Sequence, residues 1–154
     1  MKYWLGKSEP DCYSIDRLAG EKNKTTSWDG VRNYQARNFM RDEMKLGDMF
    51  LFYHSNTKPP AAVGICEVVK ESYPDFTAFD PEDDHFDPKS KDDNPTWFMV
   101  DVRLVEKFNR PVSLQEMKEN PKLKDMKLIQ KGNRLSVMPV LKKEFNEIVK
   151  MSKK

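Results

Sequence analysis

The sequence predicts a small mixed α/β (α+β) domain, built on a curved, mainly antiparallel sheet or barrel with short flanking helices. Several segments with strand-like patterns alternate along the chain with short helical patterns. A doubly wound parallel sheet is disfavoured, because it needs longer helices and usually a glycine-rich phosphate loop, and neither GxGxxG nor GxxxxGKS/T is present. The 154 residues contain no internal repeat or linker, so one domain over residues 1–154 is expected.

The first third of the chain predicts a strand and two helices. Residues Tyr3 to Lys7 are short and apolar and precede a turn, which is typical of a strand. Ser14 is placed to cap a short helix that ends at Gly20. A second helix is expected from Tyr34 until Gly47. Its apolar residues recur at helical spacing and are predicted to be buried: Ala36, Phe39, Met40 and Met44.

The middle of the chain predicts three strands and a long loop. The apolar run Met49 to Tyr53 is typical of a strand buried on both faces. Ala61 to Val69 reads as a second strand, in which Gly64 indicates a bulge or a close backbone approach. The acidic stretch from Tyr73 to Pro95 has no periodicity and is expected to be a functional or covering loop. Residues Trp97 to Val105 alternate in polarity, which predicts a half-exposed strand.

The last third predicts a capped helix, a strand and a final helix. Ser113 and Glu116 have the spacing of a capping box for a helix that ends near Asn120. A strand is expected from Arg134 to Met138. The residues predicted to be buried on the final helix are Leu141, Phe145, Ile148 and Val149.

Charge is unevenly distributed, although the formal net charge is only +2. Residues 71–95 contain nine acidic and two basic side chains, whereas residues 118–154 contain eleven basic and four acidic ones. Such a basic segment can form a positive face that attracts polyanions. The alternative is a solvated surface with a solubilising tail.

Several classes of protein and site are disfavoured. No stretch approaches the roughly 20 apolar residues of a membrane span, and no secretory signal is expected at the amino terminus. The only cysteines are Cys12 and Cys66, and with His54 and His85 they give no pair at metal-ligand spacing. We therefore expect no metal, no cofactor and no membrane association.

The sequence contains none of the common catalytic motifs. There is no GxSxG elbow, no HExxH and no zinc-deaminase signature. His54 could act with Ser55 or Cys12, but spacing fixes no carboxylate partner for it. The simpler interpretation is that His54 forms hydrogen bonds within a pocket wall or ends its strand. An enzyme is therefore not expected.

A group of aromatic and polar residues points to nucleic-acid recognition. Trp28 is predicted to lie in a loop, where its indole either stacks on a base or plugs the sheet. Asn33 carries an amide that can pair with the Watson–Crick edge of a base. On the second helix, four residues project together: Tyr34, Arg37, Asn38 and Arg41. The two arginines of this face are candidates for contacts with backbone phosphates.

The motifs SWDGVRNYQARNF and YHSN, together with GKSEP, SYPD and NRLSVMPV, resemble the EVE domain over about residues 2–150. The resemblance implies a PUA-like fold, in the superfamily of the YTH readers of methylated adenine. It also implies a pocket for a flipped, modified base, chiefly a modified cytosine in DNA, with RNA also suggested. The base-pocket residues that it implies are Lys7, Ser8, Trp28, Asn33, Tyr34, Tyr53, His54, Ser55, Asn56, Tyr73, Pro74 and Asp75.

One position departs from the YTH pattern. YTH readers supply a second cage tryptophan from a strand resembling residues 101–105, where this chain has Val102, Arg103 and Leu104. A methyladenine cage is therefore not expected. The chain is expected to be a monomeric, non-catalytic reader of nucleic acid that contains a modified base, cytoplasmic in location, or nuclear if the source is eukaryotic.

Two other functions remain open from the sequence. The first is an enzyme that acts on a modified nucleobase or nucleotide, with His54 or Asp75 as a general base. The second is a protein-interaction module that uses the acidic loop from Asp75 to Asp93 as its recognition surface.

Overall fold

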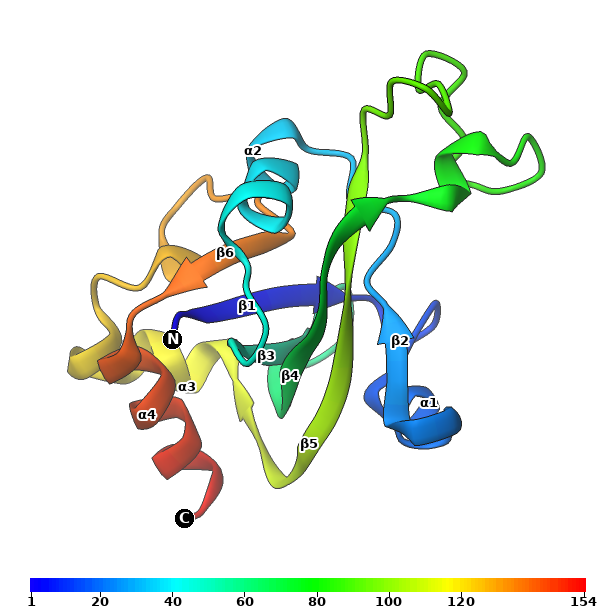
Figure 1. Cartoon of the computed structure of the whole chain (residues 1–154). Helices are drawn as coiled ribbons and strands as arrows, with labels where there is room; N and C mark the ends of the chain where they lie inside the picture. Colours follow the sequence, from blue (N-terminus) through cyan, green and yellow to red (C-terminus); the bar gives the residue numbers. More distant parts are fainter.

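The computed structural model describes residues 1–154, and its six strands form one mixed sheet in the order β2-β5-β4-β3-β1-β6 (Figure 1). Adjacent strands are antiparallel except β1 and β3, which are parallel. The strands are β1 (Tyr3–Ser8), β2 (Thr25–Ser27), β3 (Met49–His54), β4 (Ala61–Pro74), β5 (Phe98–Ser113) and β6 (Val137–Val140). The predicted fold class, a curved and mainly antiparallel sheet with short helices, is confirmed.

Four short helices flank the sheet: α1 (Ile15–Ala19), α2 (Tyr34–Asn38), α3 (Leu114–Glu119) and α4 (Lys142–Ser152). Short 3₁₀ turns cover Lys22–Lys24, Phe76–Phe79, Pro121–Leu123 and Lys127–Ile129. None of the helices combines the length and the apolar character that a membrane crossing requires.

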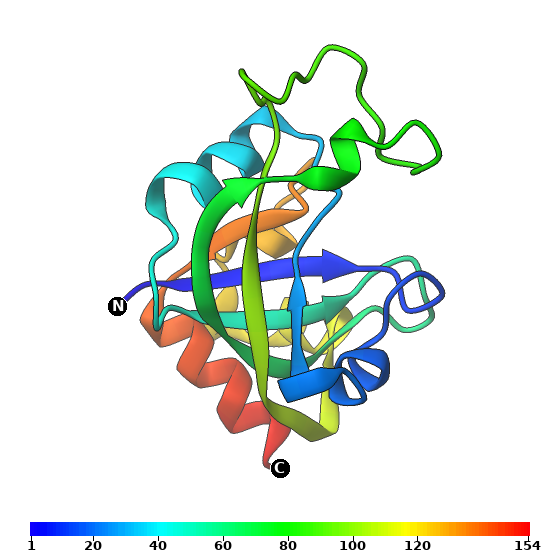
Figure 2. The same ribbon diagram turned by 45° about the vertical axis from the view of Figure 1, so that its right-hand side comes forward.

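The sheet is strongly curved because its two longest strands are irregular. Figure 2 shows β4 and β5 bending around β1 and β3. The pairing of β4 with β5 is interrupted by register shifts, the first of them between Ala62 and Gly64, and such bulges increase the local bend of a strand. A Cβ on Gly64 would lie only 2.3 Å from Ile15 Cδ1 and 2.5 Å from the Glu106 carbonyl oxygen. The predicted bulge and close approach at Gly64 are both confirmed.

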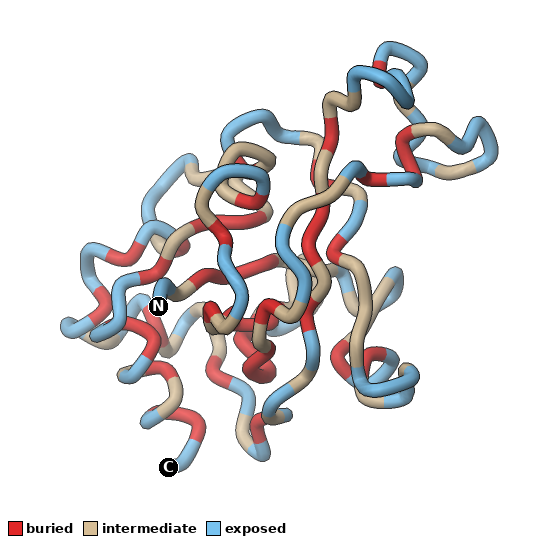
Figure 3. Tube along the Cα trace, viewed as in Figure 1, coloured by how far each residue is buried: buried red, intermediate tan, exposed pale blue.

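Buried side chains form two clusters. Figure 3 marks the buried positions along the chain in red. On β3, Phe50 and Phe52 belong to one cluster, while Leu51 and Tyr53 belong to the other. This alternation confirms the predicted strand that is buried on both faces. The first cluster also contains Trp4, Trp28 and residues of α1 and α2, and the second contains residues of α3 and α4.

The short capping signals were predicted correctly. The Ser14 side chain accepts a hydrogen bond from the Arg17 N–H at the start of α1, and Gly20 follows its end. Ser113 and Glu116 form the capping box of α3. Each of these features depends on residues only three apart, so local sequence is sufficient to define it.

Other boundaries differ from the prediction. The second helix is α-helical only to Asn38 and continues as a π-helical turn, Phe39–Glu43. β4 and β5 extend to Pro74 and Ser113, because long-range pairing between them continues beyond the apolar runs. β6 begins at Val137, not at Arg134. Leu141, predicted to be buried, is 56% exposed, because it is the N-cap residue of α4 and precedes its buried face.

Candidate functional site

A cavity of about 660 Å³ lies beside the carboxyl end of β1. Its walls come from five parts of the chain: the end of β1 with the α1 region, the segment from Thr26 to Val31, Ser55 after β3, residues of the acidic segment, and the residues just before β6. Four residues of the predicted base pocket are among those that line it: Lys7, Ser8, Trp28 and Ser55.

Trp28 belongs both to the core and to the cavity wall. Its residue is 7% exposed, and its ring makes edge contacts with Phe50 and Phe52, with centroid distances of 4.8 and 5.2 Å. The backbone N–H of Trp28 donates to the Val100 carbonyl over 2.7 Å, which fixes the loop against β5. The two interpretations of Trp28 are therefore compatible. The indole packs against the sheet and also forms part of the cavity wall, where a base could stack on it.

Gly6 provides the space that this packing needs. A Cβ at position 6 would lie 2.1 Å from Phe50 Cζ and 2.8 Å from Trp28 Cζ2. These distances are shorter than van der Waals contact, so any larger residue displaces the aromatic rings. The position of Trp28 in the cavity therefore depends on a glycine in the neighbouring strand.

We expect Gly6→Ala to lower the free energy of unfolding by about 1–3 kcal/mol, the usual effect of overpacking a core. Urea denaturation measures this change. Gly20→Ala is the matched control, because its nearest non-neighbouring atoms are 3.6 Å or more from the new Cβ and its φ is −89°. Equal stabilities of the two variants would contradict the packing role of Gly6.

Hydrogen bonds between three chain segments hold the rim near Lys7. The Lys7 N–H donates to the Ser136 carbonyl over 2.8 Å, and the Ser55 N–H donates to the Ser8 carbonyl over 3.0 Å. The Ser8 hydroxyl donates to the Tyr13 carbonyl over 2.6 Å. These hydrogen bonds join the ends of β1 and β3 and the segment before β6 into one wall of the cavity.

Several polar side chains at the cavity have no partner within the protein. The Tyr13 hydroxyl is buried without a hydrogen bond. The Lys7 ammonium makes no ion pair, and partial burial lowers its pKa. Loss of water around the Asp29 carboxyl, together with the nearby Asp75 carboxylate, raises the pKa of Asp29. The residues that line the cavity thus include a buried hydroxyl, a cation and a carboxyl group whose hydrogen-bonding capacity is not used within the protein.

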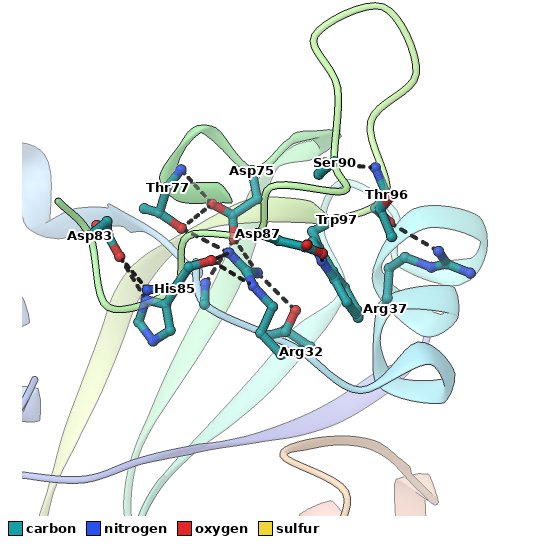
Figure 4. A network of polar contacts seen from close by, with 12 residues as sticks. Arg32, Arg37, Asp75, Thr77, Asp83, His85, Asp87, Ser90, Thr96 and Trp97 are labelled. Carbon is teal, nitrogen blue, oxygen red and sulfur yellow. Dashed lines mark hydrogen bonds and ion pairs between the residues drawn. The ribbon is translucent and has the colours of Figure 1, made fainter. Parts of the chain in front are cut away.

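Asp75 is the centre of a polar network that holds the loop at Gly30 in place (Figure 4). The side chain is fully buried and accepts hydrogen bonds from the Gly30 N–H at 2.8 Å and from Arg32 Nη1 at 3.1 Å. Its second oxygen accepts from the Thr77 N–H at 2.9 Å and from the Thr77 hydroxyl at 2.6 Å. Burial alone would raise the pKa of Asp75, but the hydrogen bonds from Thr77, Gly30 and Arg32 outweigh it and lower the pKa.

Arg32 connects this network to the acidic segment. Its Nη2 and Nε donate to the His85 carbonyl at 2.7 and 3.0 Å, and its guanidinium lies 5.3 Å from the Trp97 ring centroid. Trp97 Nε1 donates to Asp87 over 2.7 Å. The acidic segment is consequently anchored at the cavity, and two of its residues, Asp84 and His85, line the cavity wall.

The predicted residues of α2 lie outside the cavity lining. The Asn33 side chain accepts from the Ala36 N–H over 3.0 Å and caps α2. Tyr34 is 61% exposed and stacks on Trp97 with a centroid distance of 4.9 Å. Asn33 therefore stabilises the start of α2, and Tyr34 covers Trp97 at the protein surface.

The guanidinium groups proposed for phosphate contacts already have partners. Arg37 donates to the Thr96 carbonyl over 2.9 Å and to the Asn38 side-chain oxygen over 3.0 and 2.8 Å. Arg41 makes a two-pronged pair with Asp42 at 2.9 and 3.0 Å. Contacts with phosphates at these positions would compete with existing bonds.

Four further predicted residues lie outside the cavity lining. Tyr53 lies in the second core cluster, and burial raises its pKa to about 12. Asn56 donates to Glu9 over 2.7 Å near the rim. Tyr73 donates to Asp101 over 2.5 Å, and Pro74 ends β4. None of these four is part of the cavity lining.

His54 and Cys12 are not arranged for nucleophilic catalysis. His54 Nε2 accepts a hydrogen bond from the Ile15 N–H over 3.1 Å, and burial lowers the pKa of the imidazole. Loss of water contact and the adjacent Glu9 raise the pKa of the Cys12 thiol. A nucleophilic cysteine needs the opposite shift, toward the thiolate.

Sequence reasoning missed several residues of the cavity lining. Asp84, His85, Arg134 and Ser136 come from segments that lie far from Trp28 in the chain. Arg134 and Ser136 reach the cavity because β6 pairs with β1, with Gly6 opposite Val137. Asp84 and His85 lie in no quoted motif, and the motif NRLSVMPV contains Arg134 and Ser136 without indicating that they reach the cavity. Only knowledge of the strand order would have placed these four residues there.

Comparisons with known proteins agree with the fold. The EVE domain model matches residues 2–151. Thymocyte nuclear protein 1 of Rattus norvegicus is 46% identical over 97% of this chain and 73% of its own length. The crystal structure of human THYN1 protein in complex with 5-methylcytosine-containing DNA is 43% identical, covers 100% of this chain and 99% of that one, and superposes with a TM-score of 0.94.

A more distant likeness concerns the fold alone. The Mmi1 YTH domain is 13% identical, with a TM-score of 0.54 over 97% of this chain and 86% of that one. The expected relation to the YTH fold is therefore confirmed at the level of architecture. The matched family model and the identity to thymocyte nuclear protein 1 show that this chain belongs to the EVE domain family.

Proposed function

We propose that this chain is a DNA-binding reader that holds one modified cytosine, extruded from the base stack, against Trp28 in the cavity. The observation that carries the proposal is an indole in the wall of a 660 Å³ cavity that also contains unpartnered polar groups. The human relative crystallised with 5-methylcytosine DNA supports the ligand class. We accordingly propose a binding role without catalysis for this chain.

The energies of extrusion and stacking are comparable. Extruding a base costs a few kcal/mol, and less for a mismatched base. Stacking on an aromatic side chain returns about 1–3 kcal/mol per base. The cavity must therefore add hydrogen bonds to the base edge, for which Asp29 and Lys7 have free capacity.

The roles of the predicted residues follow from their positions. Lys7, Ser8, Trp28 and Ser55 are proposed to contact the base or its sugar, because they line the cavity. Asp75 is proposed to position the Trp28–Gly30 loop through its bond to the Gly30 N–H. The residues that line the cavity lie on one chain, and we propose the monomer as the functional unit.

Fluorescence-polarisation titrations of DNA oligonucleotides test this proposal. A 5-methylcytosine is expected to raise affinity over cytosine by about tenfold, since one extra methyl that packs against an apolar surface, here proposed to be the Trp28 ring, contributes about 1–3 kcal/mol. Placing the modified base opposite a mismatch should raise affinity further, because extrusion then costs less. Equal affinities for cytosine and 5-methylcytosine would refute the reader, and no gain from the mismatch would refute extrusion.

A further inference from the structure

We propose that the loop Lys131–Ser136, which precedes β6, is the surface that binds the DNA phosphates next to the cavity. This inference rests on the proposed DNA-binding function and names the part of the chain that holds the backbone. It differs from the expectation based on Arg37 of α2 and Arg41 of the following π-helical turn, because both arginines already have partners.

The loop is fixed to the cavity wall. Arg134 and Ser136 are part of the cavity lining, and the Ser136 carbonyl accepts the Lys7 N–H over 2.8 Å. The pairing of Gly6 with Val137 continues this attachment into β6. A phosphate group next to an extruded base would therefore lie within reach of this loop.

Amide side chains hold the loop in shape. Asn133 donates to the Lys127 carbonyl over 2.5 Å and accepts from the Leu135 N–H over 2.9 Å. Gln130 donates to the carbonyls of Lys124 and Met126. The backbone is thus ordered before binding, which lowers the entropic cost of a contact.

The two cations of the loop are free. Lys131 and Arg134 are exposed and take part in none of the ion pairs of the protein. An exposed arginine is well suited to a phosphate, because its planar guanidinium can make two parallel hydrogen bonds.

The charge of another part of the cavity lining supports the same placement. Asp84 also lines the cavity, and the acidic segment to which it belongs has nine carboxylates against two lysines. A DNA strand that passed over this segment would meet like charge. Repulsion by the acidic segment would therefore direct the DNA backbone toward the Lys131–Ser136 loop.

The salt dependence of DNA binding tests this inference with the double variant Lys131→Gln/Arg134→Gln. Each phosphate contact contributes about 0.9 to the slope of log K against log salt for duplex DNA, so the slope should fall by about 1.8. Affinity should fall by roughly tenfold at low salt for methylated and unmodified DNA alike, because phosphate contacts carry no base information.

The double variant Lys142→Gln/Lys143→Gln is the matched control, with the same charge change on α4. Both lysines are exposed, neither lines the cavity, and Figure 1 shows α4 apart from α1 and β2. The slope of log K against log salt for this control variant should equal that of the unaltered chain. An equal loss of slope in both double variants, or a loss in Arg41→Gln alone, would overturn the assignment to this loop.

Failure of the loop assignment can be distinguished from failure of the proposed reader function. A normal slope in Lys131→Gln/Arg134→Gln with a retained preference for 5-methylcytosine would refute only the loop. A reduced slope without any preference for methylation in the unaltered chain would refute only the reader. A reduced slope with single-stranded RNA but not with DNA would overturn the assignment of this surface to DNA.

Discussion

Replacing Asp75 with alanine is expected to lower the free energy of unfolding by about 3–5 kcal/mol, the effect of removing one partner of a buried ion pair. The Asp75 side chain is fully buried, and the paired Arg32 side chain is only 22% exposed. Without the carboxylate, the Gly30 N–H and the Thr77 hydroxyl also lose their acceptor. The anchored end of the acidic segment is then expected to detach from the Trp28–Gly30 loop.

The pH dependence of stability provides an independent check on Asp75. Its pKa is lowered in the folded state, so the unfolded chain binds more protons as the pH falls. The stabilisation is present above the unfolded pKa of about 3.9 and is lost as the pH falls through the folded value. The unaltered chain should therefore lose stability more steeply below about pH 4 than Asp75→Ala does.

Urea denaturation at several pH values measures both effects. Asp92→Ala is the matched control, because Asp92 lies in the same acidic segment, is exposed and has no ion-pair partner. Its stability should change by less than about 0.5 kcal/mol, as is usual for the surface. If Asp75→Ala were as stable as Asp92→Ala, the network in Figure 4 would not be what holds the loop.

The sequence was informative where structure depends on neighbours in the chain. Ser14 and Ser113 cap their helices as predicted, and the run Met49 to Tyr53 is buried on both faces. Leu141 shows the limit of periodicity, because an apolar residue at the correct spacing lies at the cap, before the buried face begins.

The candidate site could be predicted only in part, because it is assembled by long-range pairing. Trp28 was identified from an aromatic residue in a polar loop, and packing against the sheet was one of its two interpretations, yet nothing local indicated that Phe50 would be its neighbour. Arg134 reaches the cavity through the pairing of β6 with β1, and His85 reaches it through the bonds of Arg32. Such neighbours depend on the order of strands, which no motif in this chain encodes.

Trp28 is expected to give the largest combined effect on stability and DNA binding. Trp28→Ala should lower the free energy of unfolding by about 3–5 kcal/mol, because it removes a large ring from the core. Loss of DNA binding in this variant would therefore report unfolding as much as lost stacking. Trp28→Phe is the more informative change, since it keeps an aromatic ring against Phe50 and Phe52 while reducing the face available to a base.

Trp4→Phe is the matched control for the role of the indole at position 28. Trp4 is 1% exposed, belongs to the same core cluster and does not line the cavity. It should lose stability, because its Nε1–H donates to the buried Asp48 over 3.0 Å, but its folded form should bind methylated DNA normally. Trp28→Phe should instead weaken DNA binding by about 1 kcal/mol, at the lower end of the 1–3 kcal/mol that complete loss of stacking costs, because the smaller ring still offers part of a stacking face. The salt slope should stay unchanged, because stacking involves no phosphate. Equal affinities of the two folded variants would show that the indole at position 28 serves the core alone.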